Sequence, residues 1–141
     1  MGTLAISASI IARLAAGMPT IPIMSETQIG IEQPPPIPAV YVESAGEEVR
    51  PDPAGRGRQM CASTWAVVVR VSHIDDGGES AALRADAIVD DVNRLLIGWS
   101  PADQFERLSY AGMAAPFYNY HGGYSDFPLM FITQTVVSAR N

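Results

Sequence analysis

One amphipathic helix, whose start and stop are both encoded locally, constrains the fold of this chain more than any other feature. Between Ser80 and Pro101 the apolar residues recur at three- and four-residue spacing, at Ala85, Ile88, Val89, Val92, Leu95 and Leu96. The opposite side carries Asp86, Asp90, Asp91 and Arg94. Ser80 can cap the first turn, and Gly98, Trp99 and Pro101 form a helix stop. The segment predicts a surface helix with one buried face.

Several other segments predict strands on which this helix can pack. From Met60 to Val71 both faces of the run are mostly apolar, which indicates a central strand. From Phe127 to Ser138 the residues alternate, which predicts a closing strand with Pro128 at its start or edge. A shorter strand is expected at Ala39–Glu43, and an irregular one at Thr20–Ile23.

The first residues of the chain predict a short second helix. From Thr3 to Ala16 the apolar residues lie along one face, and Gly17 closes the pattern. Three consecutive prolines in Gln33–Pro38 indicate a rigid extended connector, with an SH3-type ligand as the alternative. The expected fold is α+β (α/β): a mixed, mainly antiparallel sheet of four to five strands, with the long helix and the short N-terminal helix packed on it. A length of 141 residues fits a single domain, 1–141.

The segment from Ser44 to Met60 combines glycines and prolines with charges, which is typical of a loop. A loop of this length is either a hairpin tip with frayed strands or a surface that becomes ordered against a partner, and we favour the second interpretation. Its candidate interface residues are Glu47, Glu48, Arg50, Asp52, Arg56 and Arg58. Arg56 and Arg58 are the best candidates for bidentate pairing with an acidic neighbour.

A second candidate interface is the aromatic segment after the long helix. Its rings are Phe117, Tyr118, Tyr120 and Tyr124, close to Met113 and Pro116. Exposed aromatic clusters are enriched at protein interfaces, where a ring contributes a large contact area at little loss of entropy. A hairpin that folds these rings onto the core is the other interpretation, and both stay open at this point.

The composition limits the partners that this chain can have. Hydrophobic residues make up 48% and charged residues 17%, so part of the apolar surface is expected to be shared with partners. The formal net charge is −6, and all nine basic residues are arginine. This balance disfavours tight nucleic-acid binding but is compatible with an acidic wall along which DNA slides. No stretch reaches the roughly 20 apolar residues that a membrane helix requires.

Catalytic and metal-binding patterns are weak. Cys61 could be paired with His73 or His121 as a nucleophile and its base, but its place in a hydrophobic strand favours a buried structural thiol. A lone cysteine excludes an intrachain disulfide, and the two histidines lack a ligand set for zinc. Asp75–Glu79 lacks the ligand spacing of a calcium loop. We therefore predict no catalytic residue, no metal site and no cofactor.

Two stretches of this sequence form a recognisable combination. The second half has a β-branched strand, then a helix that ends in Leu-Leu-Ile-Gly-Trp-Ser-Pro, then a tyrosine-rich hairpin reaching the C-terminus. The first half has a short alanine-rich helix at Leu4–Ala16 and a Pro-Ala-Val-Tyr-Val strand at Pro38–Val42. In this combination the chain resembles small tail terminator proteins of long-tailed bacteriophages. The chain departs from the family pattern in its long insert between Ser44 and Met60.

This resemblance implies a structural virion protein rather than an enzyme. Such a subunit forms a homo-oligomeric ring, expected to be hexameric, at the head-proximal end of the tail tube, where it stops polymerisation and joins the tail to the neck. The implied partners are the tail tube protein and a neck or head-completion protein, with DNA passing through the ring and no membrane involved. The implied location is the neck region of the virion tail, after assembly in the bacterial host cytoplasm.

Three other functions remain open from the sequence. Another head–tail connector or neck protein would have the same composition. A small cysteine hydrolase using Cys61 is a distant alternative, and a monomeric module that presents its proline run as a ligand is a third. For the tail terminator, we expect a rim built chiefly from Glu47–Arg58 and Ala114–Tyr124.

Overall fold

The computed structural model describes residues 5–31, 36–51, 54–73 and 80–138, and these form three helices and a six-stranded sheet. Along the chain the elements are α1 (Ile6–Gly17), β1 (Ile23–Ser25), α2 (Glu26–Ile31), β2 (Ala39–Pro51), β3 (Arg58–Ser72), α3 (Ala81–Leu96), β4 (Ser109–Met113), β5 (Phe117–Asn119) and β6 (Tyr124–Ser138). The α+β class is confirmed. The sheet has one strand more than the expected four to five because β5, which is only three residues long, is too short for a readable alternation.

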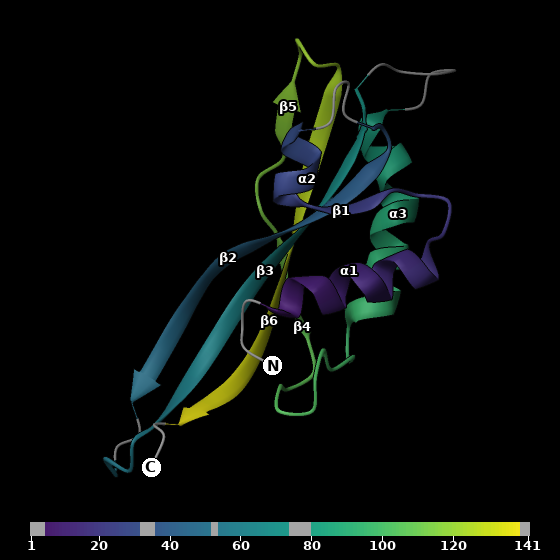
Figure 1. Ribbon diagram of the computed structural model, residues 1–141. Coiled ribbons are helices and arrows are strands. Elements are labelled where there is room, and N and C mark those ends of the chain that lie inside the picture. Colours follow the sequence, from purple (N-terminus) through teal and green to yellow (C-terminus); the bar gives the residue numbers. More distant parts are fainter. Residues whose placement is uncertain (1–4, 32–35, 52–53, 74–79, 139–141) are drawn as a thin grey trace.

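The sheet is mixed and mainly antiparallel, as predicted. Its strand order is β1-β2-β3-β6-β4, and β5 also pairs with β6. β1 runs parallel to β2, and the other pairs are antiparallel. β3 lies between β2 and β6, and all seven residues from Trp65 to Val71 are buried, so the prediction of a central strand is confirmed (Figure 1).

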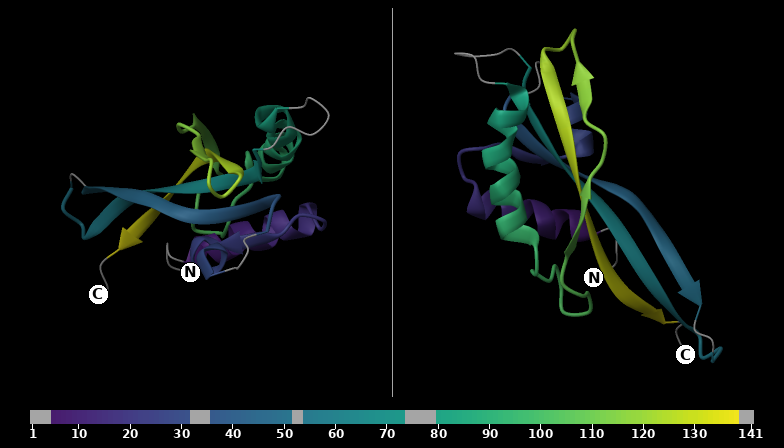
Figure 2. Two further views of the ribbon diagram at one scale, coloured as in Figure 1. Left: turned by 90° about the horizontal axis from the view of Figure 1, so that it is seen from above. Right: turned by 180° about the vertical axis from the view of Figure 1, so that it is seen from behind.

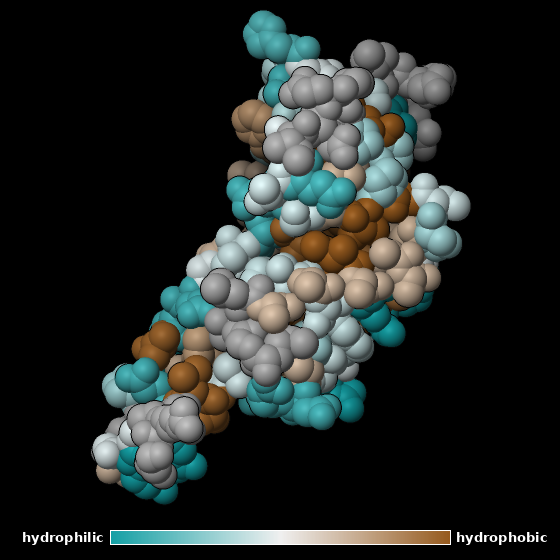
Figure 3. Space-filling model, in the orientation of Figure 1, coloured by the Kyte–Doolittle hydropathy of each residue, from teal (hydrophilic) through white to brown (hydrophobic). Residues whose placement is uncertain are grey.

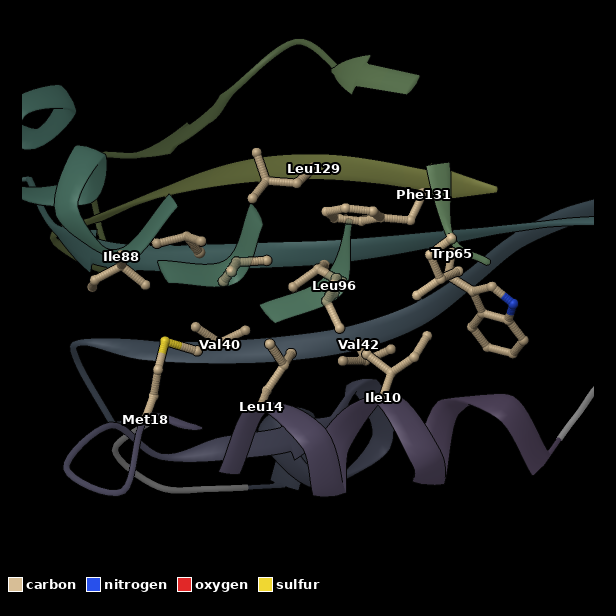
Figure 4. Packing of buried hydrophobic residues seen from close by; sticks show 14 of the residues in the cluster. Ile10, Leu14, Met18, Val40, Val42, Trp65, Ile88, Leu96, Leu129 and Phe131 are labelled. Atoms are coloured by element: carbon tan, nitrogen blue, oxygen red, sulfur yellow. The ribbon is translucent and has the colours of Figure 1, made fainter. Parts of the chain in front are cut away.

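The main hydrophobic core lies between one face of the sheet and the helices α1 and α3. Figure 4 shows Ile10 and Leu14 of α1 and Leu96 of α3 pointing toward side chains of the sheet, among them Val40 and Phe131. These five side chains are fully buried, and each contributes about 1.5–3 kcal/mol to stability. The two helices therefore cover one face of the sheet.

Both ends of α3 follow from the residues that flank it. Ser80 has an extended backbone, and its Oγ accepts a hydrogen bond of 3.3 Å from the Leu83 N–H. After the helix ends at Leu96, Gly98 adopts φ +78°, a left-handed conformation in which glycine has no steric penalty. The Gly98 N–H then donates to the Leu108 carbonyl, which turns the chain back toward the sheet.

Three local predictions differ from the structure near the N-terminus. The first helix spans Ile6–Gly17, and the start expected at Thr3 lies outside the described residues. The strand expected at Thr20–Ile23 is displaced to β1. Helix α2 was not predicted, because its six residues are too few to show a helical repeat.

Pro128 lies inside β6, where we had expected the start or the edge of a strand. It pairs with Val68 of β3, and its carbonyl accepts a hydrogen bond from Ala114, in the gap between β4 and β5. Because N–H and C=O of one strand residue point the same way, the nitrogen of Pro128 faces this gap. The missing donor therefore removes no hydrogen bond from the sheet.

The segment from Ser44 to Met60, expected to be a loop, is mostly strand. β2 continues to Pro51 and β3 begins at Arg58, so this segment is the end of a long hairpin. Figures 1 and 2 show β2, β3 and β6 continuing together beyond the helices as a narrow projection. We call this projection the arm and define it as Ser44–Pro51, Arg58–Thr64 and Ile132–Ser138. Both faces of the outer half of the arm are exposed to solvent. Its sequence therefore lacks the alternation of charged and core residues that indicates a strand, which is why the sequence predicts a loop here.

Candidate interaction surfaces

The outer half of the arm exposes apolar side chains that no described helix covers. Val49, Met60, Val136 and Val137 are 49%, 37%, 53% and 49% exposed. Figure 3 shows apolar surface near the tip of the arm, next to charged residues. Strand pairing places Met60 opposite both Arg50 and Val136, so these three side chains share one face of the arm. Val137 lies on the other face.

A cavity of about 300 Å³ opens at the tip of the arm, on the face that carries Arg50, Met60 and Val136. It is lined by Arg50, Pro51, Arg56, Arg58, Gln59, Met60 and Val136. We call it the tip cavity. Its lining combines apolar side chains with arginines, and both kinds of residue are found at the centre of protein interfaces. Three of the predicted interface residues, Arg50, Arg56 and Arg58, line this cavity, and Glu48 lines a smaller pocket that shares Arg50 and Met60 with it.

Two of the acidic residues predicted in this segment, Glu47 and Glu48, do not line the tip cavity. Glu48 pairs with Arg50 at 3.3 Å, but both side chains are exposed, and such a pair contributes little to stability. Glu47 is exposed and follows a bulge at which Gly46 adopts φ +112°. Asp52, and the segment Asp75–Glu79 considered as a calcium loop, lie outside the described residues.

The inner half of the arm is closed on its second face by a loop, and this closure buries Cys61. Thr133 Oγ1 donates to the Glu106 carbonyl at 2.6 Å, and Thr135 Oγ1 donates to the Gln104 carbonyl at 2.8 Å. Cys61 pairs with Thr135 and is 2% exposed, and burial raises the pKa of its thiol. The loop therefore makes this thiol a poor nucleophile.

The structure does not bring Cys61 together with either histidine. His73 comes directly after Ser72, the last residue of β3. Ser72 is eleven residues beyond Cys61 on the same strand, which is a distance of roughly 36 Å. His121 lies in the turn after β5, at that same far end, where the His73 ring contacts Tyr120 at a centroid distance of 4.7 Å. The distance leaves the hydrolase hypothesis without the histidine base that it names.

The aromatic segment forms a second exposed surface at the opposite end of β6. Phe117, Tyr118 and Tyr120 are 57%, 48% and 76% exposed, and we call these three residues the aromatic end. Tyr118 rests edge-on against the buried Phe127. Tyr124 behaves differently, since its ring is half-buried beneath the Arg70 guanidinium at 3.8 Å. Of the two interpretations left open, exposure therefore applies to the aromatic end and packing against the body applies to Tyr124.

The two candidate surfaces are far apart in one molecule. β5 pairs with the first residues of β6, Tyr124–Asp126, whereas Arg58 of the arm pairs with the last, Ser138. Twelve residues of strand separate Asp126 from Ser138, a distance of about 40 Å. The sequence had suggested one rim built from both segments, but the structure places them at opposite ends of an elongated chain (Figure 2).

A buried polar cluster, which sequence reasoning missed, lies beneath the aromatic end. Arg70 donates two hydrogen bonds to the Asp126 carboxylate, at 2.8 and 3.0 Å, and Tyr41 donates a third at 3.0 Å. Burial and the Asp126 charge raise the pKa of Tyr41 well above its ordinary value. Burial alone would lower the pKa of Arg70, but its hydrogen bonds to Asp126 and the charge of that carboxylate raise it. The cluster ties β2, β3 and β6 together, and its only sequence signal was an arginine within an apolar strand.

Two other kinds of site are absent from the part of the chain that the structure describes. There, no three side chains among His, Cys, Asp and Glu gather in a way that could hold a metal ion. In the same residues, no helix has both the length and the apolar character needed to cross a membrane.

The comparison with protein families identifies the chain. Residues 26–141 match the family model described as Phage tail terminator protein. The chain belongs to this family. The resemblance read from the sequence is thus confirmed, and it makes this tail terminator family member a structural protein of a phage tail. The match begins at α2, so α1 lies outside it.

The fold is similar to that of a chain in a solved structure. A chain of the structure described as "Virion of native gene transfer agent (GTA) particle" has a TM-score of 0.56 and 16% sequence identity. The similarity covers 93% of this tail terminator chain and 94% of the other chain. None of the curated proteins matches. At this identity the similarity supports the fold alone.

Proposed function

We propose that this tail terminator chain is a subunit of a homo-oligomeric ring, expected to be hexameric, at the head-proximal end of the phage tail tube. The ring occupies the growing face of the last tube layer, stops further polymerisation and offers a new face to a neck or head-completion protein. The proposed site of action is the neck region of the virion tail, after assembly in the host cytoplasm. Family membership supports the proposal.

The observation that carries it is the position of the two exposed apolar surfaces. The tip cavity and the aromatic end lie at opposite ends of an elongated chain, so a contact between the tip cavity of one copy and the aromatic end of the next can be repeated from copy to copy. Contacts of this heterologous kind generate a ring when the rotation between copies closes. Isologous contacts would instead stop at a dimer.

The composition supports a channel through which DNA passes without sticking. A net charge of −6 and the absence of lysine give little attraction for phosphates. Another connector or neck protein is the second candidate, because the same fold and charge would serve it equally. The two differ in what they bind first, since a terminator binds the tube and a neck protein binds the head.

Electron microscopy of the purified chain mixed with purified tail tubes tests the proposal. We expect a ring at one end of each tube, and tubes capped in this way should not lengthen when free tube protein is added. Tubes that keep their bare ends and continue to grow would contradict the proposed function. Density on the head portal in place of the tube would favour the neck protein.

A further inference from the structure

We propose that the tip cavity of one subunit receives the aromatic end of the next subunit in the ring. This inference rests on the proposed function and names the contact by which the ring closes. The occupant is a second copy of this chain, and the side chains that enter the cavity are Tyr118 and Tyr120.

The first step concerns what the tip cavity can bind. Its lining includes the apolar side chains of Met60 and Val136 together with the arginines Arg50, Arg56 and Arg58. The apolar part of this lining favours a hydrophobic side chain, and guanidinium groups favour either carboxylates or the faces of aromatic rings. The occupant should therefore be an apolar ring, with or without an acidic group beside it.

The second step finds such rings within the chain. The aromatic end provides Tyr118 and Tyr120, which are 48% and 76% exposed. The sequence from Leu108 to Ser125 contains no Asp, Glu, Lys or Arg, so no arginine there repels the tip. The chain contains such cation–π contacts within its own fold. The Arg70 guanidinium lies 3.8 Å from the ring centroid of Tyr124, and that of Arg13 lies 5.5 Å from the ring centroid of Trp99.

The third step excludes other arrangements of the same surfaces. About 40 Å of strand separates the tip cavity from the aromatic end, so one chain cannot bring its own surfaces together. Two tips facing each other would leave the aromatic end of each copy outside the contact. The outer side of α3 carries Asp86 and Asp90, but exposed carboxylates cannot pack against the apolar part of the lining. A head-to-tail contact between copies satisfies both surfaces.

Two variants with complementary defects test this contact. Val136→Asp places a carboxylate in the tip cavity, where it engages the arginines and repels a ring. Tyr118→Ala with Tyr120→Ala removes the aromatic side chains. Each variant alone should lose at least about tenfold in self-association, measured by analytical ultracentrifugation of the isolated chain and by ring occupancy on tail tubes.

Mixing the two variants gives the decisive result. The Val136→Asp chain retains its aromatic end, and the double tyrosine variant retains its tip cavity, so one intact contact forms per pair. We expect a heterodimer that cannot grow further, visible by native mass spectrometry. A mixture that stays monomeric, or that closes into rings, would overturn the inference.

The matched control is Val137→Asp, the same substitution one residue along β6 on the opposite face of the arm. Val137 is 49% exposed, similar to Val136 at 53%, so strand stability should change equally in both variants, and thermal unfolding checks this. Assembly of the control should match the wild type, and an equal loss would overturn the inference. Rings that form normally with all three variants would reject this contact but leave the proposed function standing. A wild-type chain that forms no ring, even on tubes, rejects both.

Discussion

At the scale of single residues, the buried cluster around Arg70 is where one substitution has the largest effect. The Arg70 and Asp126 side chains are 9% and 7% exposed. Arg70→Ala leaves a buried carboxylate without its cation, and we expect the free energy of unfolding to fall by about 3–5 kcal/mol. Urea denaturation measures this. Arg94→Ala, which breaks an exposed pair with Asp91, is the control and should lower it by less than about 1 kcal/mol. Equal effects would contradict this account.

Glu43 gives the chain a pH dependence at the same scale. Burial raises the pKa of this carboxyl, and the Glu26 carboxylate of α2 raises it further. A raised folded-state pKa means that the folded chain holds the proton more tightly than the unfolded chain. The stabilisation from Glu43 is therefore complete below the ordinary glutamate pKa and is lost as pH rises through the folded-state value.

Glu43→Gln should accordingly stabilise the fold at pH 7, because it removes the repulsion between the two carboxylates. The gain should shrink toward pH 4, where the wild-type carboxyl is protonated. Urea denaturation of both chains at several pH values measures it. A gain that stays constant with pH would show that the charge of Glu43 is not its cause.

At the scale of elements, two glycines with different backbone conformations, one after a helix and one inside a helix, should respond differently to alanine. Gly98 adopts φ +78° after α3, and a Cβ there would touch nothing within 4 Å, so Gly98→Ala carries only the backbone strain of about 1–2 kcal/mol. Gly30 lies within α2 at a negative φ, also in open space, so Gly30→Ala should stabilise by about 0.5–1 kcal/mol. Thermal unfolding compares the two. Changes of the same sign would contradict the assigned conformations.

The elements also show why some of the fold was predictable. α3 and β3 are long enough for their periodicity to appear, and each buries residues in one consistent pattern. α2 and β5 are too short for that, so only tertiary contacts determine them. Pro128 was misplaced because no local pattern reveals a gap between two strands that are distant in sequence.

The candidate surfaces were predictable in part. The arginines near Arg56 and the rings near Tyr118 were identified from residue type alone, because charge and aromatic content are visible without a fold. Their separation was not, since it follows from the fifteen-residue length of β6. The cluster of Arg70 with Asp126 joins residues 56 positions apart, and no local spacing could have predicted it.

At the scale of the whole molecule, the body should fold without the tip of the arm. Val49 pairs with Cys61, so an Asn-Gly turn that replaces Arg50–Met60 would close the hairpin two residue pairs earlier. The core residues all lie outside the deleted segment, and we expect an unfolding temperature within a few degrees of the wild type. Analytical ultracentrifugation should find only monomers. A large loss of thermal stability would instead show that the arm supports the body.

The bulged, charged outer edge of β2 also affects the chain before it meets a tube. Beyond β1, this edge of the arm has no strand beside it in the described residues, and an open strand edge is a template for fibre growth. The bulge at Gly46 and the charges of Glu47, Glu48 and Arg50 oppose such pairing. Free copies of this chain can therefore reach high concentration without pairing edge to edge.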